Sequence, residues 1–149
     1  GFELMLAADL CLAAVDAKLG LTQAAQGRLP CHGGTQRLPR VVGVASALRM
    51  ILLGEILSAR RAVSLGLALR AVPRPRLRSL GRTLAREVAD RGPIAQRLAK
   101  EALRAARDLP LAEGLRLEGD LYVLLQTTRD RREGIASFHA RRRPRFVGR

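Results

Sequence analysis

Tryptophan is absent from this sequence, and aromatic residues make up only 3% of its 149 positions. An aromatic core is therefore excluded, and leucine, alanine and valine must fill the interior. Hydrophobic residues nevertheless reach 48%, which is too many for a chain that is disordered for lack of apolar side chains. Alanine, leucine and arginine are good helix formers, so the composition favours a mainly helical domain of ordinary size.

Cysteine is also scarce, since Cys11 and Cys31 are the only two. They are too few for a disulfide framework, and no Cys/His spacing indicates a metal site. No apolar run approaches the roughly 18 residues of a membrane span. Glu3 and Asp9 interrupt the N-terminal apolar pattern, which does not resemble a signal peptide. We expect an intracellular protein, cytoplasmic in a bacterium or in the mitochondrial matrix of a eukaryote.

Lysine is nearly missing, because 25 of the 27 basic residues are arginines. This preference is typical of a high-GC genome, so the net charge of +14 does not by itself indicate a nucleic-acid partner. The charge is uneven, with five arginines and no acid in residues 140–149. Single-strand binding usually needs aromatic stacking platforms, which are scarce here. RNA binding is therefore kept only as a lesser alternative.

Strand signals occur only in the first half of the chain, whereas helix signals dominate the second half. A short buried strand is expected around Leu10, Leu12 and Val15. Thr35 and Ser58 are plausible helix N-caps. The other expected strands cover residues 18–21 and 67–72, and the expected helices cover residues 1–8, 35–42, 45–53, 59–65, 77–88, 94–107, 110–124 and 129–140.

This division predicts a partial α/β core over residues 1–75 and a helical region over residues 76–149. The late helices carry apolar stripes that have no obvious partners, for example Leu117, Leu121 and Leu124. We expect either that the four late helices bury one another, or that they pack in an oligomer or against a missing N-terminal half. The chain also opens without Met inside an apolar pattern, as a fragment does.

Three segments carry a family resemblance. Residues 1–10 read G-F-E-L-M-L-A-A-D-L, and residues 27–40 read G-R-L-P-C-H-G-G-T-Q-R-L-P-R. Residues 127–134 read T-T-R-D-R-R-E-G, and Phe138 and the ending R-R-P-R-F follow them. In order and spacing the segments resemble the C-terminal half of the crotonase superfamily, the enoyl-CoA hydratase/isomerase group.

The resemblance implies an α/β fold, namely the last part of a crotonase-like ββα spiral followed by a helical trimerisation region. It also implies an acyl-CoA substrate and lyase-type hydration or double-bond isomerisation, as in fatty acid β-oxidation. Coenzyme A would be part of the substrate, with no further cofactor. The partner would be a second copy of the chain, in a trimer or a dimer of trimers. A non-catalytic fragment that retains only the association helices is the alternative.

Glu3 falls on the family's first catalytic glutamate, and position 23 corresponds to the second. Here position 23 is Gln23, whose amide can hydrogen-bond a water but cannot take or give its proton. Paired-carboxylate hydration is therefore in doubt, while a single-carboxylate proton shuttle stays possible. In the family, one oxyanion N–H comes from an N-terminal segment and the other from the glycine before Gly1. We expect that the residues given cannot build this oxyanion hole in the family's way.

The remaining site candidates also come from the resemblance. Gly1 and Cys31 would lie at the substrate, Cys31 replacing a glycine, while Phe138 and Arg141 would help to hold the CoA nucleotide. A Cys31–His32 nucleophile is not expected, because neighbours in sequence are poorly placed for that role. We expect Gly33 and Gly34 to allow tight packing of a helix start rather than to bind an anion.

Overall fold

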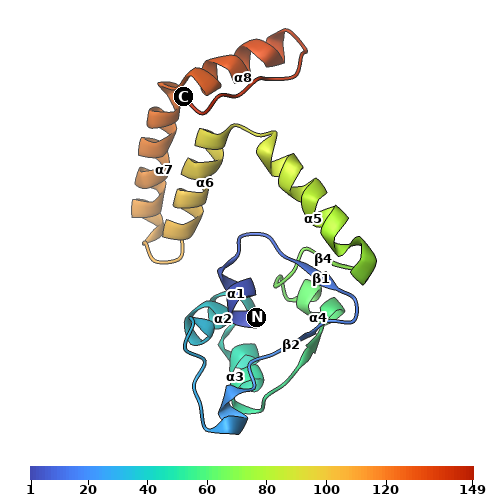
Figure 1. The fold of residues 1–149 in the computed structure, drawn as a ribbon. Helices are drawn as coiled ribbons and strands as arrows, with labels where there is room; N and C mark the ends of the chain where they lie inside the picture. Colours follow the sequence, from blue (N-terminus) through green and yellow to red (C-terminus); the bar gives the residue numbers. More distant parts are fainter. The chain divides into compact units, whose positions relative to one another are not determined.

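The computed structural model describes all 149 residues, which form two compact units (Figure 1). Unit 1 contains residues 1–82 and unit 2 contains residues 83–149. The division lies inside helix α5 (Arg74–Ala89), and the boundary expected at residue 75 lies at the start of this helix. Each unit has its own internal packing.

Unit 1 is built from short helices and very short strands. The strands form two pairs: β1 is parallel to β4, and β2 is antiparallel to β3. In chain order the elements are α1 (Phe2–Ala7), β1 (Leu12–Ala14), β2 (Lys18–Leu19), the 3-10 helix η1 (Gln23–Gln26), α2 (Gly34–Val42), α3 (Val44–Leu52), β3 (Leu57–Ser58), α4 (Ala59–Ser64) and β4 (Arg70–Val72).

The first strand is shorter and less buried than its sequence predicts. Within β1 only Ala13 and Ala14 are buried, while Leu10 and Val15 are 48% and 52% exposed. The prediction that Leu10 and Val15 belong to a buried strand is therefore wrong. Apolar alternation does not distinguish a strand that is covered by neighbours from one that pairs with a single partner, as β1 does.

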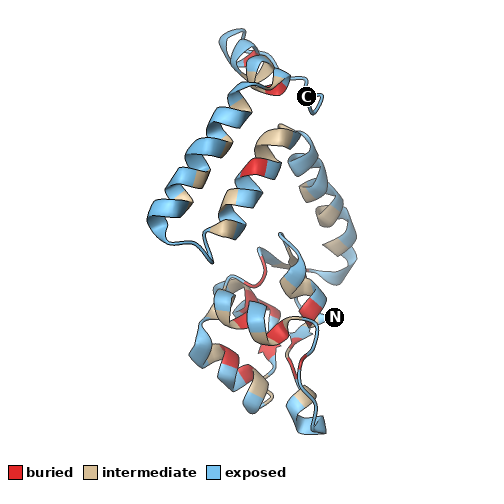
Figure 2. Ribbon diagram, turned by 90° about the vertical axis from the view of Figure 1, so that its left-hand side faces the viewer, coloured by how far each residue is buried: buried red, intermediate tan, exposed pale blue.

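The core of unit 1 is aliphatic, as the lack of aromatic residues requires. Leu21, Leu38 and Met50 are its largest fully buried side chains, and Figure 2 shows the buried residues gathered inside this unit. Leu38 of α2 has no exposed surface, and burying such a side chain contributes about 1.5–3 kcal/mol. Its burial fixes α2, and with it the loop that precedes this helix.

Helix starts in unit 1 are set by one serine and one glycine. Ser58 Oγ accepts the Arg61 backbone N–H at 3.2 Å, which confirms the predicted cap of α4. The predicted Thr35 cap is wrong, because α2 begins at Gly34 with Gly33 as its N-cap. Gly33 has φ 93°, and a Cβ there would meet the Arg37 guanidinium, so this turn favours glycine.

Unit 2 contains the end of α5 and three further helices, α6 (Pro93–Ala105), α7 (Leu111–Gln126) and α8 (Arg129–His139). Pro93 opens α6 as expected, and α6 and α7 lie side by side (Figure 1). Helix α7 has no buried residue, and α6 buries only Leu98. The late helices therefore bury one another's apolar stripes only in part: Leu117 and Leu121 are half-buried, whereas Leu124 is exposed.

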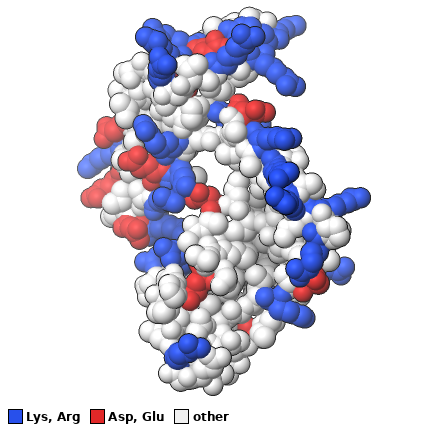
Figure 3. Space-filling view, in the orientation of Figure 1, with Lys and Arg blue, Asp and Glu red and all other residues white.

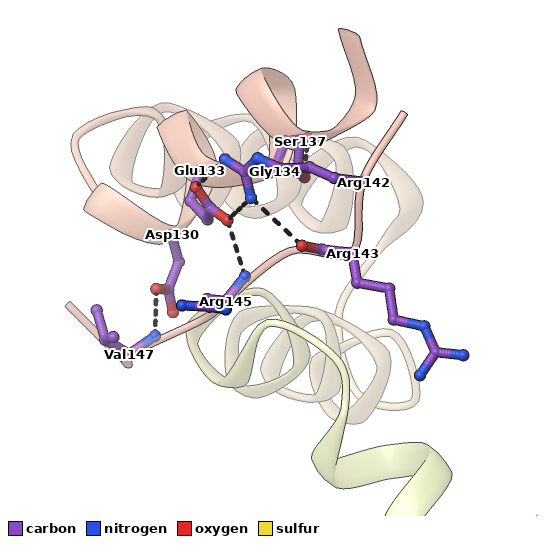
Figure 4. Close-up of polar contacts among 8 residues, drawn as sticks. All are labelled: Asp130, Glu133, Gly134, Ser137, Arg142, Arg143, Arg145 and Val147. Carbon is purple, nitrogen blue, oxygen red and sulfur yellow. Dashed lines mark hydrogen bonds and ion pairs between the residues drawn. The ribbon is translucent and has the colours of Figure 1, made fainter. Parts of the chain in front are cut away.

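The C-terminal tail, residues 141–149, folds back along α8 and is held by two carboxylates (Figure 4). Asp130 is 4% exposed and accepts the N–H groups of Val147 and Gly148 at 2.7 and 2.8 Å. Glu133 pairs with the Arg142 guanidinium through both of its oxygens, at 2.6 and 2.8 Å. The D-R-x-E-G motif thus acts as a clamp on the tail.

Basic side chains are spread over α5 and over α8 with the tail, as the space-filling view shows (Figure 3). Helix α5 alone has the sequence R-P-R-L-R-S-L-G-R-T-L-A-R-E-V-A. The uneven charge inferred from the sequence is therefore present, and it also covers a helix in the middle of the chain. None of the helices combines the length and the apolar character needed to cross a bilayer.

Candidate functional site

Glu3 is a buried carboxylate that connects α1 to the loop before α2. Its side chain lies on the first turn of α1 and is only 8% exposed in total. Oxygen Oε1 accepts the backbone N–H groups of His32 and Gly34, each at 2.9 Å. A charged side chain is rarely buried without such partners. The loop thus holds one oxygen of Glu3 and leaves Oε2 available for other contacts.

The protonation state of Glu3 results from two opposing effects. Burial raises the pKa of its carboxyl group, whereas hydrogen bonds from the Gly34 and His32 N–H groups, together with the nearby His32 ring, lower it. The lowering effects win, so the pKa lies below its ordinary value of 4.5. Glu3 is therefore an anion at neutral pH, which suits a residue that accepts a proton.

Gln23 lies next to the second oxygen of Glu3, Oε2. Its Nε2 donates to Glu3 Oε2 at 3.4 Å, whereas its own Oε1 is buried and has no hydrogen-bond partner. An unsatisfied buried acceptor costs about 1–3 kcal/mol. The two positions that the sequence singled out as a catalytic pair are thus neighbours, and the amide at the second position has an acceptor that a ligand or a water could satisfy after a side-chain rotation.

Gly34 is a component of this site that the sequence did not predict as such. A Cβ at this position would lie 2.9 Å from Glu3 Oε1, 2.9 Å from Leu21 Cδ1 and 3.1 Å from Pro30 Cβ. Only glycine lets the main chain approach the carboxylate this closely. The tight packing expected for the helix start is present, and the group packed against it is the candidate catalytic carboxylate itself.

Cys31 and His32 are close to Glu3 but do not form a nucleophile with a relay. Cys31 Sγ lies 3.5 Å from His32 Nδ1, and the same Nδ1 lies 3.5 Å from Glu3 Oε2. A thiol–imidazole–carboxylate relay needs one ring nitrogen for each neighbour. Because both contacts converge on one nitrogen of an exposed ring, this geometry agrees with the expectation that no such nucleophile is present.

A small hollow of about 240 Å³ opens beside Glu3 and Gln23. It brings together Gly1, Glu3 and Gln23, three of the residues singled out from the sequence, whereas Cys31 does not line it. Gln26 and Arg28 also line it, and the sequence had not assigned either of them to a site. The remaining lining residues are Phe2, Gly20, Leu21 and Thr22.

Phe138 and Arg141, the expected CoA-binding pair, lie in unit 2 at the end of α8. Phe138 is 82% exposed, and its ring and the His139 ring are close to perpendicular, with the ring centroids 6.0 Å apart. Arg141 has φ 50°, and it is the only non-glycine residue with a positive φ. Both side chains stand on the surface where the chain reverses into the tail, so each is accessible to a ligand.

The chain combines two features. Glu3 is buried and held by the loop that contains Gly33, and the short helices and strands of this part are followed by a series of longer helices. The sequence model of the enoyl-CoA hydratase/isomerase family matches residues 1–149. The chain therefore belongs to the enoyl-CoA hydratase/isomerase family, as its motifs had predicted. The expected α/β crotonase-like fold is confirmed by the solved structures that resemble it.

Individual relatives agree with this assignment. The chain is 44% identical over 152 residues to the mitochondrial enoyl-CoA hydratase domain-containing protein 2 of Bos taurus, covering 99% of this chain and 51% of the relative. It is 40% identical over 149 residues to the 2,3-dehydroadipyl-CoA hydratase of Escherichia coli (strain K12), covering 100% of this chain and 58% of the relative. The chain thus spans about half the length of these relatives.

An enoyl-CoA hydratase structure from Bacillus anthracis superimposes with a TM-score of 0.96 at 41% identity, covering 100% of this chain and 58% of that one. The corresponding structure from Geobacillus kaustophilus HTA426 gives a TM-score of 0.95 at 39% identity, over 99% of this chain and 58% of that one. These likenesses cover the whole chain, including both units.

Proposed function

We propose that this chain carries the general base of an enzyme that acts on enoyl-CoA thioesters in fatty or branched acyl-CoA metabolism. One observation supports the proposal above the others. The Glu3 carboxylate is buried beside a hollow and one of its oxygens is held by two backbone N–H groups, so an ionised proton acceptor is fixed in position next to a space for a ligand.

Of the family's reactions, double-bond isomerisation fits these side chains best. Glu3 Oε2 would take a proton from C2 of a 3-enoyl thioester, the electrons of that C–H bond would move toward the thioester carbonyl, and Glu3 would return the proton to C4. One carboxylate suffices for both transfers. Gln23 would orient Glu3 Oε2 through its Nε2 but would carry no proton.

Hydration is the second candidate function, and the names of relatives favour it. Three of them are called hydratases of benzylidenesuccinyl-CoA, 2,3-dehydroadipyl-CoA and methylglutaconyl-CoA. A water would have to donate one O–H to Glu3 and be held by Gln23 Oε1, the acceptor that has no partner. Because an amide cannot supply the proton that the acyl chain needs, we expect hydration to be the slower reaction.

The test compares two substrates and two variants of the 149-residue chain. Conversion of 3-butenoyl-CoA to crotonyl-CoA and hydration of crotonyl-CoA are measured for the unaltered chain, for Glu3→Gln and for Glu55→Gln. The latter is a matched change at a glutamate that pairs with Arg49. Loss of a general base costs about 10²–10⁴ in rate, so we expect that loss for Glu3→Gln alone.

Equal rates for the unaltered chain and Glu3→Gln would contradict the proposal. A chain that turns over neither thioester above the rate in buffer would instead indicate the non-catalytic fragment that the sequence left open. Filter binding of single-stranded RNA across a salt series tests the remaining alternative. Weak retention that is lost near physiological salt would count against a nucleic-acid function.

We also propose that the protein assembles as a homo-oligomer, a trimer or a dimer of trimers, and needs no cofactor besides the CoA of its substrate. Leu111, Leu115 and Val123 of α7 are 57–78% exposed, an apolar surface that a second copy could cover. Relatives named mitochondrial occur in Bos taurus and Homo sapiens, and others are bacterial. We propose the mitochondrial matrix or the bacterial cytoplasm accordingly, depending on the source.

A further inference from the structure

We propose that Arg28 makes the hollow beside Glu3 selective for acyl groups that carry a second, distal carboxylate. The inference rests on the proposed acyl-CoA function and specifies its substrate class. Arg28 and Glu3 carry the only charged side chains that line the hollow. Glu3 already has its hydrogen-bond partners in the Gly34 and His32 N–H groups, so the Arg28 charge is available to a ligand.

The path of the main chain brings Arg28 into the lining of the hollow. Helix η1 ends at Gly27, whose φ of 64° turns the chain, and the Arg28 N–H then donates to the Gln23 carbonyl at 3.0 Å. The backbone of Arg28 is thus bonded to the residue that contacts the candidate base. Because Arg28 and Glu3 line the same hollow, one ligand in that hollow could contact both side chains.

The side chain of Arg28 is oriented by its neighbour. Its Nη2 donates to Gln26 Oε1, a contact on the exposed rim of the hollow. A guanidinium has five N–H donors, so this bond leaves a fork that can bind a carboxylate through two parallel hydrogen bonds. The amides of Gln23 and Gln26 and the Thr22 hydroxyl add further polar groups around it.

An apolar acyl end would fit this lining poorly. It would remove water from the guanidinium and the amides without replacing their hydrogen bonds, which is unfavourable. The volume of about 240 Å³ is below the range of drug-sized pockets, which suits a short acyl group. A dicarboxylic acyl chain of about five or six carbons satisfies both the charge and the volume.

The experiment uses two thioesters that differ only at the distal end of a five-carbon chain, glutaryl-CoA with a carboxylate and pentanoyl-CoA with a methyl group. Isothermal titration calorimetry gives the ratio of their dissociation constants for the unaltered chain, for Arg28→Gln and for Arg60→Gln. Arg60 is an exposed arginine of the same unit that does not line the hollow. We expect about a fivefold preference for glutaryl-CoA, lost in Arg28→Gln and kept in Arg60→Gln.

Because Arg28 is exposed, its substitution should leave the fold intact, and circular dichroism of each variant checks this. Equal affinity of the unaltered chain for both thioesters would overturn the inference while leaving the acyl-CoA function standing. A uniform loss of both affinities in Arg28→Gln, with an unchanged ratio, would also overturn it and would assign Arg28 to a CoA phosphate. Binding of neither thioester would reject the proposed function together with the inference.

Discussion

The backbone N–H of Val147 donates to Asp130 Oδ1 at 2.7 Å, across 17 positions of sequence. Asp130 also accepts the Gly148 N–H at 2.8 Å, and the Arg149 main-chain oxygen accepts the N–H groups that open α8 at Arg129 and Asp130. The first turn of α8 and the end of the tail therefore satisfy each other's polar groups. A motif that identified the family has a structural role here, because it holds the tail in place.

Replacing Asp130 by alanine tests that role. The change leaves two backbone donors without their acceptor, and hydrogen bonds to a charged group contribute about 1.5–3 kcal/mol each. We expect the free energy of unfolding to fall by about 3–6 kcal/mol in urea denaturation followed by circular dichroism. Asp120→Ala on the exposed surface of α7 is the control and should change it by less than about 0.5 kcal/mol. Equal effects of the two changes would refute the role.

The second clamp residue predicts a pH dependence. The hydrogen bonds from Arg142 and from the Arg145 N–H lower the pKa of Glu133 from 4.5 to about 2. Because the folded pKa is the lower one, the stabilisation is complete above pH 4.5 and disappears as the pH falls toward 2. We expect the difference in unfolding free energy between the unaltered chain and Glu133→Gln to shrink across this window. A difference that stays constant from pH 6 to pH 2 would contradict the ion pair.

Gly34 offers a test of the site that leaves the Glu3 side chain itself unaltered. Gly34→Ala places a methyl group 2.9 Å from Glu3 Oε1, so either the carboxylate or Leu21 must move. We expect a loss of about 1–3 kcal/mol in stability and a slower Glu3-dependent isomerisation. Gly81→Ala is the matched control, because Gly81 lies in α5 with open space around it, and there alanine should stabilise by up to about 1 kcal/mol.

Gln23→Glu would restore a second carboxylate beside Glu3. Two neighbouring carboxylates raise one of their pKa values, so one member of the pair could act as an acid while the other acts as a base. We expect crotonyl-CoA hydration to rise about tenfold or more relative to 3-butenoyl-CoA isomerisation. Gln26→Glu adds the same charge to the same hollow one helical turn away and should not change this ratio.

Local patterns predicted much of this fold. Gly and Pro placed the helix ends, as at Pro93, and a serine placed the cap of α4, because these signals act within a few residues. The burial of Leu10 and Val15 was predicted wrongly, because it depends on which elements cover a strand. The cap of α2 was assigned to Thr35 rather than Gly33, because the need for a left-handed φ follows from the path of the loop.

The candidate site was only partly predictable, for a similar reason. The motif gave Glu3 and the twenty-residue spacing gave Gln23, and the structure places the two in contact. The His32 and Gly34 N–H groups were not predicted as partners of Glu3, because backbone donors carry no sequence signal of their own. Arg28 was also missed, since its position depends on how η1 turns the chain at Gly27.

The two main-chain hydrogen bonds to Glu3 Oε1 restrict how long the side chain at position 3 can be. An aspartate at this position would be one carbon shorter, a retraction of roughly 1.5 Å, and could reach either the His32 and Gly34 amides or the hollow, but not both. The position of the loop therefore requires the side-chain length of glutamate and disfavours aspartate. The Glu3→Asp variant should therefore lose activity although its charge is unchanged, because its carboxylate cannot contact the loop amides and a ligand at the same time.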